Sequence, residues 1–416
     1  MSSIAAAGAM QQQLQSINSP LSMAHSAAGL SSAAAGIDDI ALTVHSDVAG
    51  IEHIWRELES ISPASIYQRF EWILAWCEHA APALGIEPAV VIGRRGNQPV
   101  LLLPFGRQRR NLGVEIAWLG CSHSNIGMGL FEPDFLGSLS PTATDDLFAN
   151  IIKSLQPVDI IALRNQPFTW AGAANPFRQL SGKVADHPVM AIHLANDFGS
   201  MLNAKKRKKL RWQENALESS GGYRFFQARD RAEANAVFDE FLSQKDQQFA
   251  KLGIGNVFAG PGPVDFFRAL INRSISSDDP TIQLYGIEIA GAIKATFAGG
   301  VFRNRLHGYF SGITVDQFQR VSPGELLLHH VVKQCCAEGR AVLDLGVGEE
   351  RYKASWSPDR EPQFAIYAPA SVKGQLLARA MKLTHLAKSW VKRNDTAWEA
   401  ARRMRRLKAV VKKTNR

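Results

Sequence analysis

Residues 306–325 read LHGYFSGITVDQFQRVSPGE, an apolar strand pattern that runs into a polar loop and then into the start of a helix. In the loop, Arg320 can neutralise a phosphate, Ser322 can cap the helix, Pro323 fits the first helical turn, and Gly324 lets a ligand approach the backbone. First-turn amides have no partner within a helix, and the helix dipole favours negative charge. The stretch predicts a site for an anion such as a pyrophosphate; a well-capped helix without a ligand is the alternative.

The segments around this loop follow a plan that occurs twice. In the second half we predict strands over 282–289, 292–301, 306–313 and 341–345, with a helix over 325–338 that Gly339 ends. In the first half we predict a hairpin over 88–93 and 99–105, a strand over 114–119, a Ser, Asn and Gly loop over 122–129, a helix after Thr142 and a strand over 158–163. The repeat predicts a duplicated α/β domain. Helices over 203–219 and 231–250 should pack on the second sheet.

Composition sets the broad class. The chain has 416 residues, of which 46% are hydrophobic and 20% charged, as expected for two globular domains. Residues 1–38 are rich in Ala, Ser and Gln and contain no Lys or Arg, which predicts a disordered tail rather than a targeting signal. No apolar run reaches the length of a membrane span, so we expect a cytoplasmic protein. The four cysteines form neither a disulfide framework nor a metal pattern, and we expect no metal.

The positive charge is concentrated at the C-terminal end. Residues 371–416 contain fourteen Lys or Arg and two acids, while the whole chain has a formal charge of +9, so the remainder is slightly acidic. Each predicted helix of this tail has apolar residues on one face: Leu383, Leu386 and Trp390 in the first, Met404, Leu407 and Val411 in the second. We expect peripheral contact with an anionic membrane at the inner face. Helices packed on the body, with a solvated cationic face, are the alternative. Nucleic acid is disfavoured because no binding motif accompanies the charge.

Two acidic positions lie near the last predicted strand. Asp344 stands between Leu343 and Leu345, so burial could raise its pKa into a catalytic range, or it could serve as a structural hydrogen-bonding group. Glu349 and its neighbour Glu350 stand at the strand's exit, where a carboxylate could act as a general base. Acids at a helix start are also favoured by the helix dipole.

Four segments together resemble the GNAT-type acetyltransferases of the CelD/BcsL group, a cellulose-biosynthesis-associated, BioF2-like family. They are Lys205–Leu210, Tyr309–Gly312, Gln319–Glu325, and Leu343–Lys353 with Trp356. The resemblance covers about residues 40–370. It implies two tandem GNAT-like domains with a mixed, mostly antiparallel sheet flanked by helices, the first copy degenerate, as in the Fem transferases. The implied boundaries are 39–198 for the degenerate domain, 199–370 for the acetyltransferase domain and 371–416 for the basic amphipathic tail.

Site residues follow from the resemblance position by position. It implies that the backbone of Phe310, Ser311, Gly312 and Ile313 holds the pantetheine arm of acetyl-CoA. It implies that the loop holds the pyrophosphate through Arg320, Ser322, Gly324 and Glu325. The chain departs from the usual family pattern, which has small residues where Pro323 and Glu325 stand.

The resemblance also implies catalytic roles. Tyr352 is the expected acid for the departing thiolate, Glu349 the expected base and Lys353 a cation that binds the acceptor. Each has a simpler alternative: a packing tyrosine, an ordinary helix-start acid and a solvated lysine. The run Ser122–Asn125 is an acceptor-groove loop or a simple connection.

Three hypotheses on function remain open. The first is an acetyl-CoA-dependent acyltransferase that acts on an amine or hydroxyl of an envelope or exopolysaccharide precursor by direct attack. The second is a Fem-like transferase that uses aminoacyl-tRNA, which the basic run Lys205–Arg211 would permit. The third is a non-catalytic scaffold for polysaccharide synthesis at the membrane.

Overall fold

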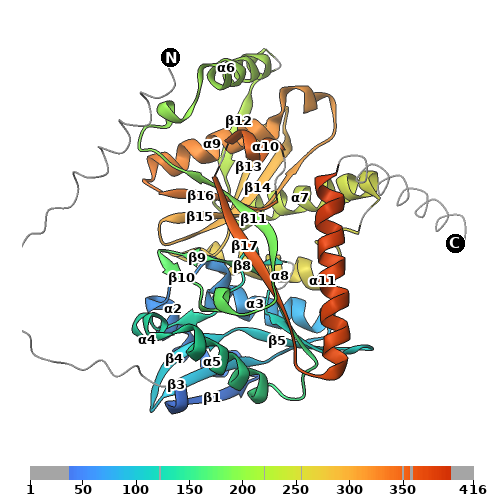
Figure 1. The fold of residues 1–416 in the computed structure, drawn as a ribbon. Helices are drawn as coiled ribbons and strands as arrows, with labels where there is room; N and C mark the ends of the chain where they lie inside the picture. The colour runs from blue at the N-terminus through green and yellow to red at the C-terminus, as the bar shows by residue number, and fades with distance from the viewer. Residues whose placement is uncertain are drawn as a thin grey trace, which may run out of the picture. The chain divides into compact units, whose positions relative to one another are not determined.

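The computed structural model describes residues 37–120, 123–219, 221–253, 255–348, 351–356 and 359–394. From Ile37 onward these residues form a single compact unit. Nearly all of the predicted N-terminal tail and the second helix of the basic tail lie outside the described residues. The fold is α/β with a large, mostly antiparallel sheet flanked by helices, so the predicted fold class is confirmed (Figure 1).

The main sheet has eleven strands in the order β12-β13-β14-β15-β16-β11-β17-β8-β6-β5-β2. Neighbouring strands are antiparallel except at two places, β15 with β16 and β6 with β8. The second half contributes β12 (Tyr223–Gln227), β13 (Gln283–Ile289), β14 (Ala292–Phe302), β15 (Arg305–Ile313), β16 (Val342–Val347) and β17 (Asp359–Pro369). The first half contributes β2 (Ile86–Pro88), β5 (Phe105–Arg110), β6 (Gly113–Trp118), β8 (Ile160–Pro167) and β11 (Lys183–His193).

The two halves exchange their last strands. β11 follows β8 in the chain but pairs with β16 of the second half, whereas β17 follows β16 but pairs with β8 of the first half. β11 and β17 also pair with each other, antiparallel, in the middle of the sheet (Figure 1). The sheet is therefore continuous across residue 198, and the domain boundary there stays a prediction.

The first copy departs from the second in its hairpin. β3 (Val90–Arg95) and β4 (Gln98–Leu103) form a separate four-stranded sheet with β1 (Ile40–His45) and β7 (Leu130–Phe131). Pro104 lies between β4 and β5, where its missing N–H interrupts the hydrogen-bond ladder. β5 then joins the main sheet, where it is a strand that the predicted repeat does not contain.

Helices of both halves meet in one core on one face of the sheet. They are α2 (Glu52–Ile61), α3 (Phe70–Leu84), α7 (Arg231–Leu252) and α8 (Pro261–Ser274). Trp72 of α3 packs edge to face on Phe266 of α8, with 5.0 Å between ring centroids. Such aromatic contacts stabilise a pair beyond the area they bury.

Three further helices flank the second half and the sheet's middle strands. α9 (Pro323–Ala337) packs on the face opposite α7, since neighbouring residues Phe297 and Ala298 of β14 lie in the two different cores. α11 (Val372–Arg393) lies against β17 and β8. α6 (Ala204–Glu218) buries Leu210 and Leu217 in the same core as residues of β13 and β14, and its Gln213 donates to the Val321 carbonyl oxygen before α9 at 2.8 Å. Buried residues of both α6 and α7 thus share cores with strands of the second half, as expected for 203–219 and 231–250.

Candidate functional site: a fork between two parallel strands

The candidate site begins where β15 and β16 separate. Their parallel pairing covers three residue pairs, from Arg305 with Val342 to His307 with Asp344. On its other side, β15 continues to pair with β14 as far as Ile313. The β14–β15 register shifts so that Tyr309 is an extra residue, which is a β-bulge. Bulges bend a strand and re-aim its side chains. The far edge of residues 308–313 is therefore directed away from β16 and forms one side of a fork.

A charged cluster stabilises the closed end of the fork. The Asp344 carboxylate is fully buried, accepts a hydrogen bond from the Gly346 amide at 2.6 Å and one from Arg305 Nη2 at 3.3 Å, and lies 3.3 Å from His307 Nδ1. Arg305 also makes a two-pronged ion pair with Glu361 of β17, at 2.8 and 2.6 Å. Gly346 adopts a φ of +75°, which favours glycine at this position.

These contacts correct the expectation for Asp344. Burial by itself disfavours the charged carboxylate, but Arg305, His307 and the Gly346 amide outweigh it and lower the pKa of Asp344 below its ordinary value. The predicted raised pKa is therefore wrong. Asp344 remains ionised at neutral pH, and its contacts favour the structural alternative.

A loop from the first half enters the fork. Asn125 Nδ2 donates to the Gly308 carbonyl oxygen at 3.2 Å and to the buried Tyr67 hydroxyl at 2.7 Å. Gln363 of β17 donates to the Asn125 carbonyl oxygen at 2.9 Å. The predicted Ser, Asn and Gly loop thus contacts both halves, and residues 121 and 122 lie outside the described part. We assigned Asn125 to this loop, but its contact with β15 is not evident from the sequence.

The strand predicted to bind pantetheine has two different sides. The Phe310 ring stacks on Phe241 of α7 with centroids 3.9 Å apart, which anchors β15 to the core. The backbone of residues 310–313 pairs with β14 along one edge. Alternate residues of an antiparallel strand bond to its neighbour, and Thr314 donates to the Lys294 carbonyl oxygen of β14, so Gly312 also faces β14. Ser311 and Ile313 therefore direct their amides and carbonyls to the second edge, at the fork. The binding of pantetheine there stays a prediction.

The predicted phosphate loop is a short 3₁₀ turn, η7 (Gln317–Val321), followed by α9. Pro323 occupies the first turn of α9, as predicted. Ser322 has a φ of +50° and makes no side-chain cap, so the predicted cap is wrong; the turn places Ser322 in the left-handed region, where its hydroxyl does not reach the first-turn amides. A Cβ at Gly324 would stand 2.6 Å from Ile313 Cγ2, so glycine permits β15 to approach the helix start. Arg320 is exposed beside it.

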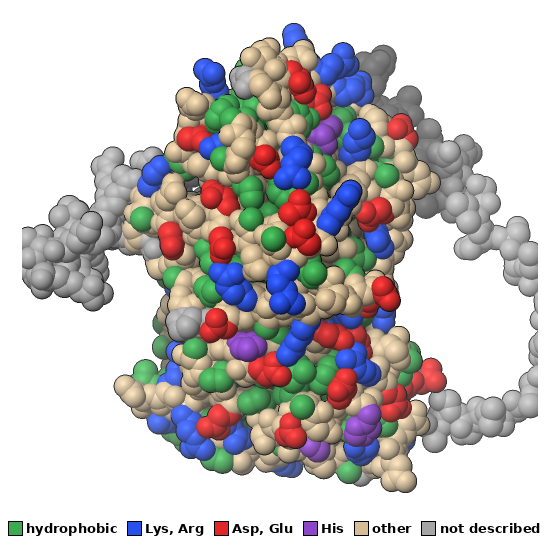
Figure 2. All heavy atoms as spheres, turned by 180° about the vertical axis from the view of Figure 1, so that it is seen from behind, with side chains coloured by type: hydrophobic (Ala, Val, Ile, Leu, Met, Phe, Trp, Pro, Cys, Tyr) green, Lys and Arg blue, Asp and Glu red, His purple; other side chains and the backbone are tan. Residues whose placement is uncertain are grey.

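Two lysines of α6 stand next to this helix start. Lys209 makes an ion pair with Glu325 in the first turn of α9. Lys206 donates to the Ser355 carbonyl oxygen at 3.1 Å, and its Nζ lies 3.0 Å from the centroid of the Trp356 ring. Burial lowers the pKa of Lys206 to about 8, with Glu325 opposing and Lys209 reinforcing that shift. Lys and Arg side chains stand at the top of the molecule, at the level of α6 (Figure 2).

The short helix α10 (Arg351–Trp356) carries the remaining predicted residues. Tyr352 is 44% exposed, consistent with access to a ligand. Lys353 is buried and donates to the Val347 carbonyl oxygen at 2.9 Å, so the alternative of a solvated lysine is wrong. Glu349, the predicted base, lies outside the described residues. The catalytic roles of these three residues and of Asp344 stay predictions.

A family match identifies an acyltransferase domain of the GNAT type in the second half of the chain. Residues 204–354, from the first residue of α6 into α10, match the family model described as an acetyltransferase (GNAT) domain. That segment contains the fork, the phosphate loop and α6 but neither of the exchanged strands β11 and β17.

Solved structures agree with the fold. FemX superposes with a TM-score of 0.54 at 9% sequence identity, and the match covers 82% of this chain and 99% of that one. The C-terminal domain of an Agrobacterium fabrum protein classed as a lysylphosphatidylglycerol synthetase gives a TM-score of 0.50 at 10% identity, covering 81% and 95%. A comparison with curated proteins gave no match.

Proposed function

We propose that this chain transfers an acetyl group from acetyl-CoA to an amine or hydroxyl by direct attack. The observation that carries the proposal is the fork itself, where an unpaired strand edge lies beside a helix N-terminus flanked by lysines. The edge of residues 310–313 matches an extended amide-bearing arm, and the helix start matches a pyrophosphate. Lys206, Lys209 and Arg320 add the positive charge that a phosphate group requires.

The reaction needs three groups besides the donor. The acceptor nitrogen or oxygen attacks the thioester carbonyl carbon, and the C–S bond breaks as the new bond forms. Glu349 takes the proton that the acceptor loses, Tyr352 gives a proton to the departing thiolate, and backbone amides of β15 stabilise the negative carbonyl oxygen. Lys353 positions the acceptor through the turn after β16, since its ammonium group donates to the Val347 carbonyl oxygen.

For the acceptor we propose an envelope or exopolysaccharide precursor, on the strength of the resemblance to the CelD/BcsL group. A cellular experiment distinguishes the hypothesis of a non-catalytic scaffold from that of an acetyltransferase. A Tyr352→Phe strain that keeps the phenotype of the parent, while the purified variant has lost transfer, would favour the scaffold.

Titration calorimetry with acetyl-CoA, followed by thiol release with amine and hydroxyl acceptors, tests the donor. We expect saturable binding, and Tyr352→Phe should lower the turnover rate by roughly a hundredfold or more with little change in acetyl-CoA affinity. Tyr223→Phe is the matched control, because its hydroxyl contacts His330 in the middle of α9 and has no proposed catalytic role. Absence of acetyl-CoA binding at millimolar concentration would refute this donor.

The exposed face of α6 favours one second candidate. Lys205, Lys208 and Arg211 are exposed, as a helix that follows a nucleic-acid backbone requires. An aminoacyl-tRNA donor would use this face. This candidate would be supported if the protein does not bind acetyl-CoA but binds aminoacyl-tRNA with an affinity that falls steeply as the salt concentration rises.

We further infer that α11 rests on an anionic membrane surface. Its outer face exposes Val372, Leu376, Leu383, Leu386 and Trp390, all at helical spacing along one stripe. The opposite face, with Ala378, packs on β17 and β8. The helix sequence contains six Lys or Arg and no acid, which complements anionic lipid. No helix in the described ranges is long and apolar enough to cross a bilayer.

A further inference from the structure

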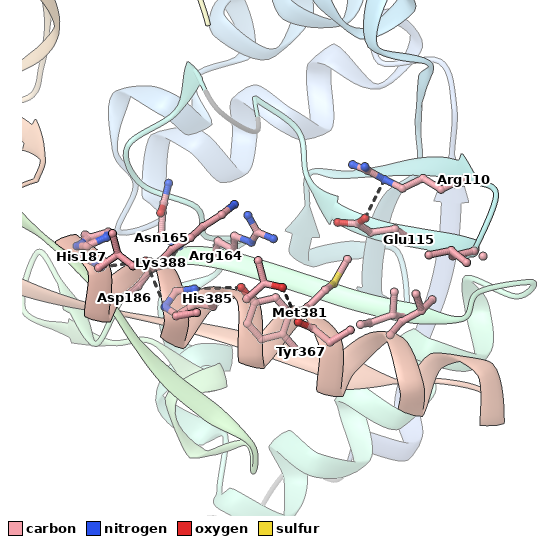
Figure 3. A pocket seen from close by; sticks show the side chains of 18 of the residues that line it. Arg110, Glu115, Arg164, Asn165, Asp186, His187, Tyr367, Met381, His385 and Lys388 are labelled. Carbon is pink, nitrogen blue, oxygen red and sulfur yellow. Dashed lines mark hydrogen bonds and ion pairs between the residues drawn. The ribbon is translucent and has the colours of Figure 1, made fainter. Parts of the chain in front are cut away.

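The first half contains a fork of its own. β6 and β8 run parallel for two registered pairs, Glu115 with Ile160 and Ile116 with Ile161. Past these pairs lies a cavity of about 520 Å³, lined by residues of both strands, among them Trp118, Ala162 and Arg164. It adjoins a groove of about 1540 Å³ that runs beneath α11 (Figure 3). The two spaces share Arg110, Glu115, Arg164, Asn165 and Met381 in their walls.

The acids of this wall are already engaged. Glu115 pairs with Arg110 at 3.1 Å. The Asp186 carboxylate accepts hydrogen bonds from the amides of Asn165 and His187, at 3.2 and 2.9 Å, and lies 3.9 Å from His385 Nε2. Among the described residues, neither acid makes an ion pair with Arg164 or Lys388.

Two cations of the same wall have no such counter-charge. The Arg164 guanidinium carbon lies 5.6 Å from the centroid of the Tyr367 ring. Neither Arg164 nor Lys388 makes an ion pair with a carboxylate among the described residues. In Figure 3 both side chains extend to the same side of α11. Their charge predicts an anionic ligand group, and a guanidinium suits a phosphate or carboxylate well.

Part of the groove wall is apolar. α11 contributes Leu377, Met381 and Val391, and the strands contribute Ile160. A site that combines two uncompensated cations with an aliphatic wall matches a ligand that carries both an anionic group and a hydrocarbon portion.

One loop contacts both the cavity and the acyl-transfer fork. Ser124 and Gly127 line the cavity, and Asn125 between them donates to Gly308 at the second-half fork. One loop thus forms a wall of the cavity and part of the other fork.

We propose that the groove beneath α11, together with the cavity that it adjoins, binds the acyl acceptor, an amphiphile whose phosphate or carboxylate group meets Arg164 and Lys388 and whose apolar part lies along α11. The acceptor role rests on the function proposed above, whereas the binding itself does not.

Calorimetry with the full chain tests the binding, with dodecyl phosphate below its micelle concentration as the probe. Dodecyl maltoside and inorganic phosphate separate the contribution of the apolar chain from that of the anion. We expect saturable binding of dodecyl phosphate, at least tenfold weaker in Arg164→Ala and in Lys388→Ala. Lys373→Ala is the control, because it removes an exposed α11 cation that is not part of the groove wall. Equal affinity in Arg164→Ala, or equal affinity of the wild type for dodecyl maltoside or inorganic phosphate, overturns the proposal.

Acetyl-CoA titrations on the same proteins keep the two proposals apart. Unchanged acetyl-CoA affinity in Arg164→Ala, together with competitive inhibition of transfer by dodecyl phosphate, supports the acceptor role. If dodecyl phosphate binds but acetyl-CoA does not, the donor proposal fails while the binding site stands. If dodecyl phosphate binds without inhibiting transfer in an active enzyme, the acceptor role is refuted.

Discussion

Asn125 of the first half donates a hydrogen bond to the carbonyl oxygen of Gly308 in the second half, at the point where β15 leaves β16. The same amide nitrogen donates to the Tyr67 hydroxyl, which is buried. The first copy therefore contributes a side chain directly to the fork of the second.

Asn125→Ala should disturb both stability and the fork. The change leaves the buried Tyr67 hydroxyl without this partner, which should lower the free energy of unfolding by about 1–3 kcal/mol. Because β15 loses a contact at the fork, the turnover rate should fall more than the affinity for acetyl-CoA. Denaturant unfolding and steady-state kinetics measure the two effects. Gln179→Ala, at an exposed glutamine, is the control. A variant as stable and active as the parent would show that the contact has no influence.

Asp344→Asn should destabilise the chain strongly. It leaves Arg305 with one charged partner fewer in a buried setting, a change that typically costs about 3–5 kcal/mol. Denaturant unfolding at pH 7 measures the loss, and Asp145→Asn, at an exposed site on a helix, should change little.

The same carboxyl predicts a pH dependence. Because folding lowers the pKa of Asp344, its stabilising contribution is complete above the ordinary Asp value of about 3.9 and is lost as the pH falls through the lowered pKa. The stability difference between the parent and Asp344→Asn should therefore shrink in acid. A difference that stays constant from pH 7 down to pH 3 would contradict the assignment.

Lys206 should make donor binding pH-dependent above neutrality. The pKa of this lysine is lowered to about 8, so its ammonium is present at pH 7 and largely lost by pH 9. The affinity for acetyl-CoA should fall over that interval, and Lys206→Met should weaken binding roughly tenfold at pH 7 and flatten the curve. Lys205→Met, at an exposed neighbour, should keep both the affinity and the slope. Identical pH profiles for Lys206→Met and the parent would exclude Lys206 from the phosphate site.

Much of the second half could be predicted from sequence, because its apolar runs and its Gly339 helix end are local signals. The order of strands, loop and helix from 282 to 345 is confirmed by β13, β14, β15, α9 and β16. In the first half, β5 was missed because its sequence, FGRQRR, is strongly basic. α8 was missed because it opens with Pro-Gly-Pro, which is typical of a turn.

The central strands and the fork's inner contacts could not be predicted. β11 contains one proline and two charged residues, β17 contains two prolines and three charged residues, and their pairing partners lie far away in sequence. That Lys206 and Lys209 lie together beside the start of α9 had one signal in the sequence, because residues three apart on a helix share a face. The contacts of Asp344 gave no such signal, because Arg305, His307 and Glu361 are brought to it by sheet register alone.

Anionic vesicles test the outer face of α11. The double change Leu383→Ser and Leu386→Ser should reduce binding to vesicles rich in phosphatidylglycerol about tenfold or more, because it removes apolar surface that enters the interface. Binding of the parent should weaken as salt rises, since the lysines and arginines of α11 are then screened. Gln375→Ser is the control on the same helix. Undiminished binding by the double variant, or equal binding to uncharged vesicles, would refute the membrane contact.

Because β11 and β17 are exchanged, each copy needs a strand of the other to complete its part of the sheet. A chain that lost its first copy would also lose β11, and the edge of β16 would be left with open backbone groups, a hazard for aggregation. Selection for an active second copy is thus enough to retain the first copy, even if the first copy has no catalytic activity. Duplication has here produced mutual dependence instead of redundancy, and a first copy freed from catalysis can acquire a different ligand without being discarded.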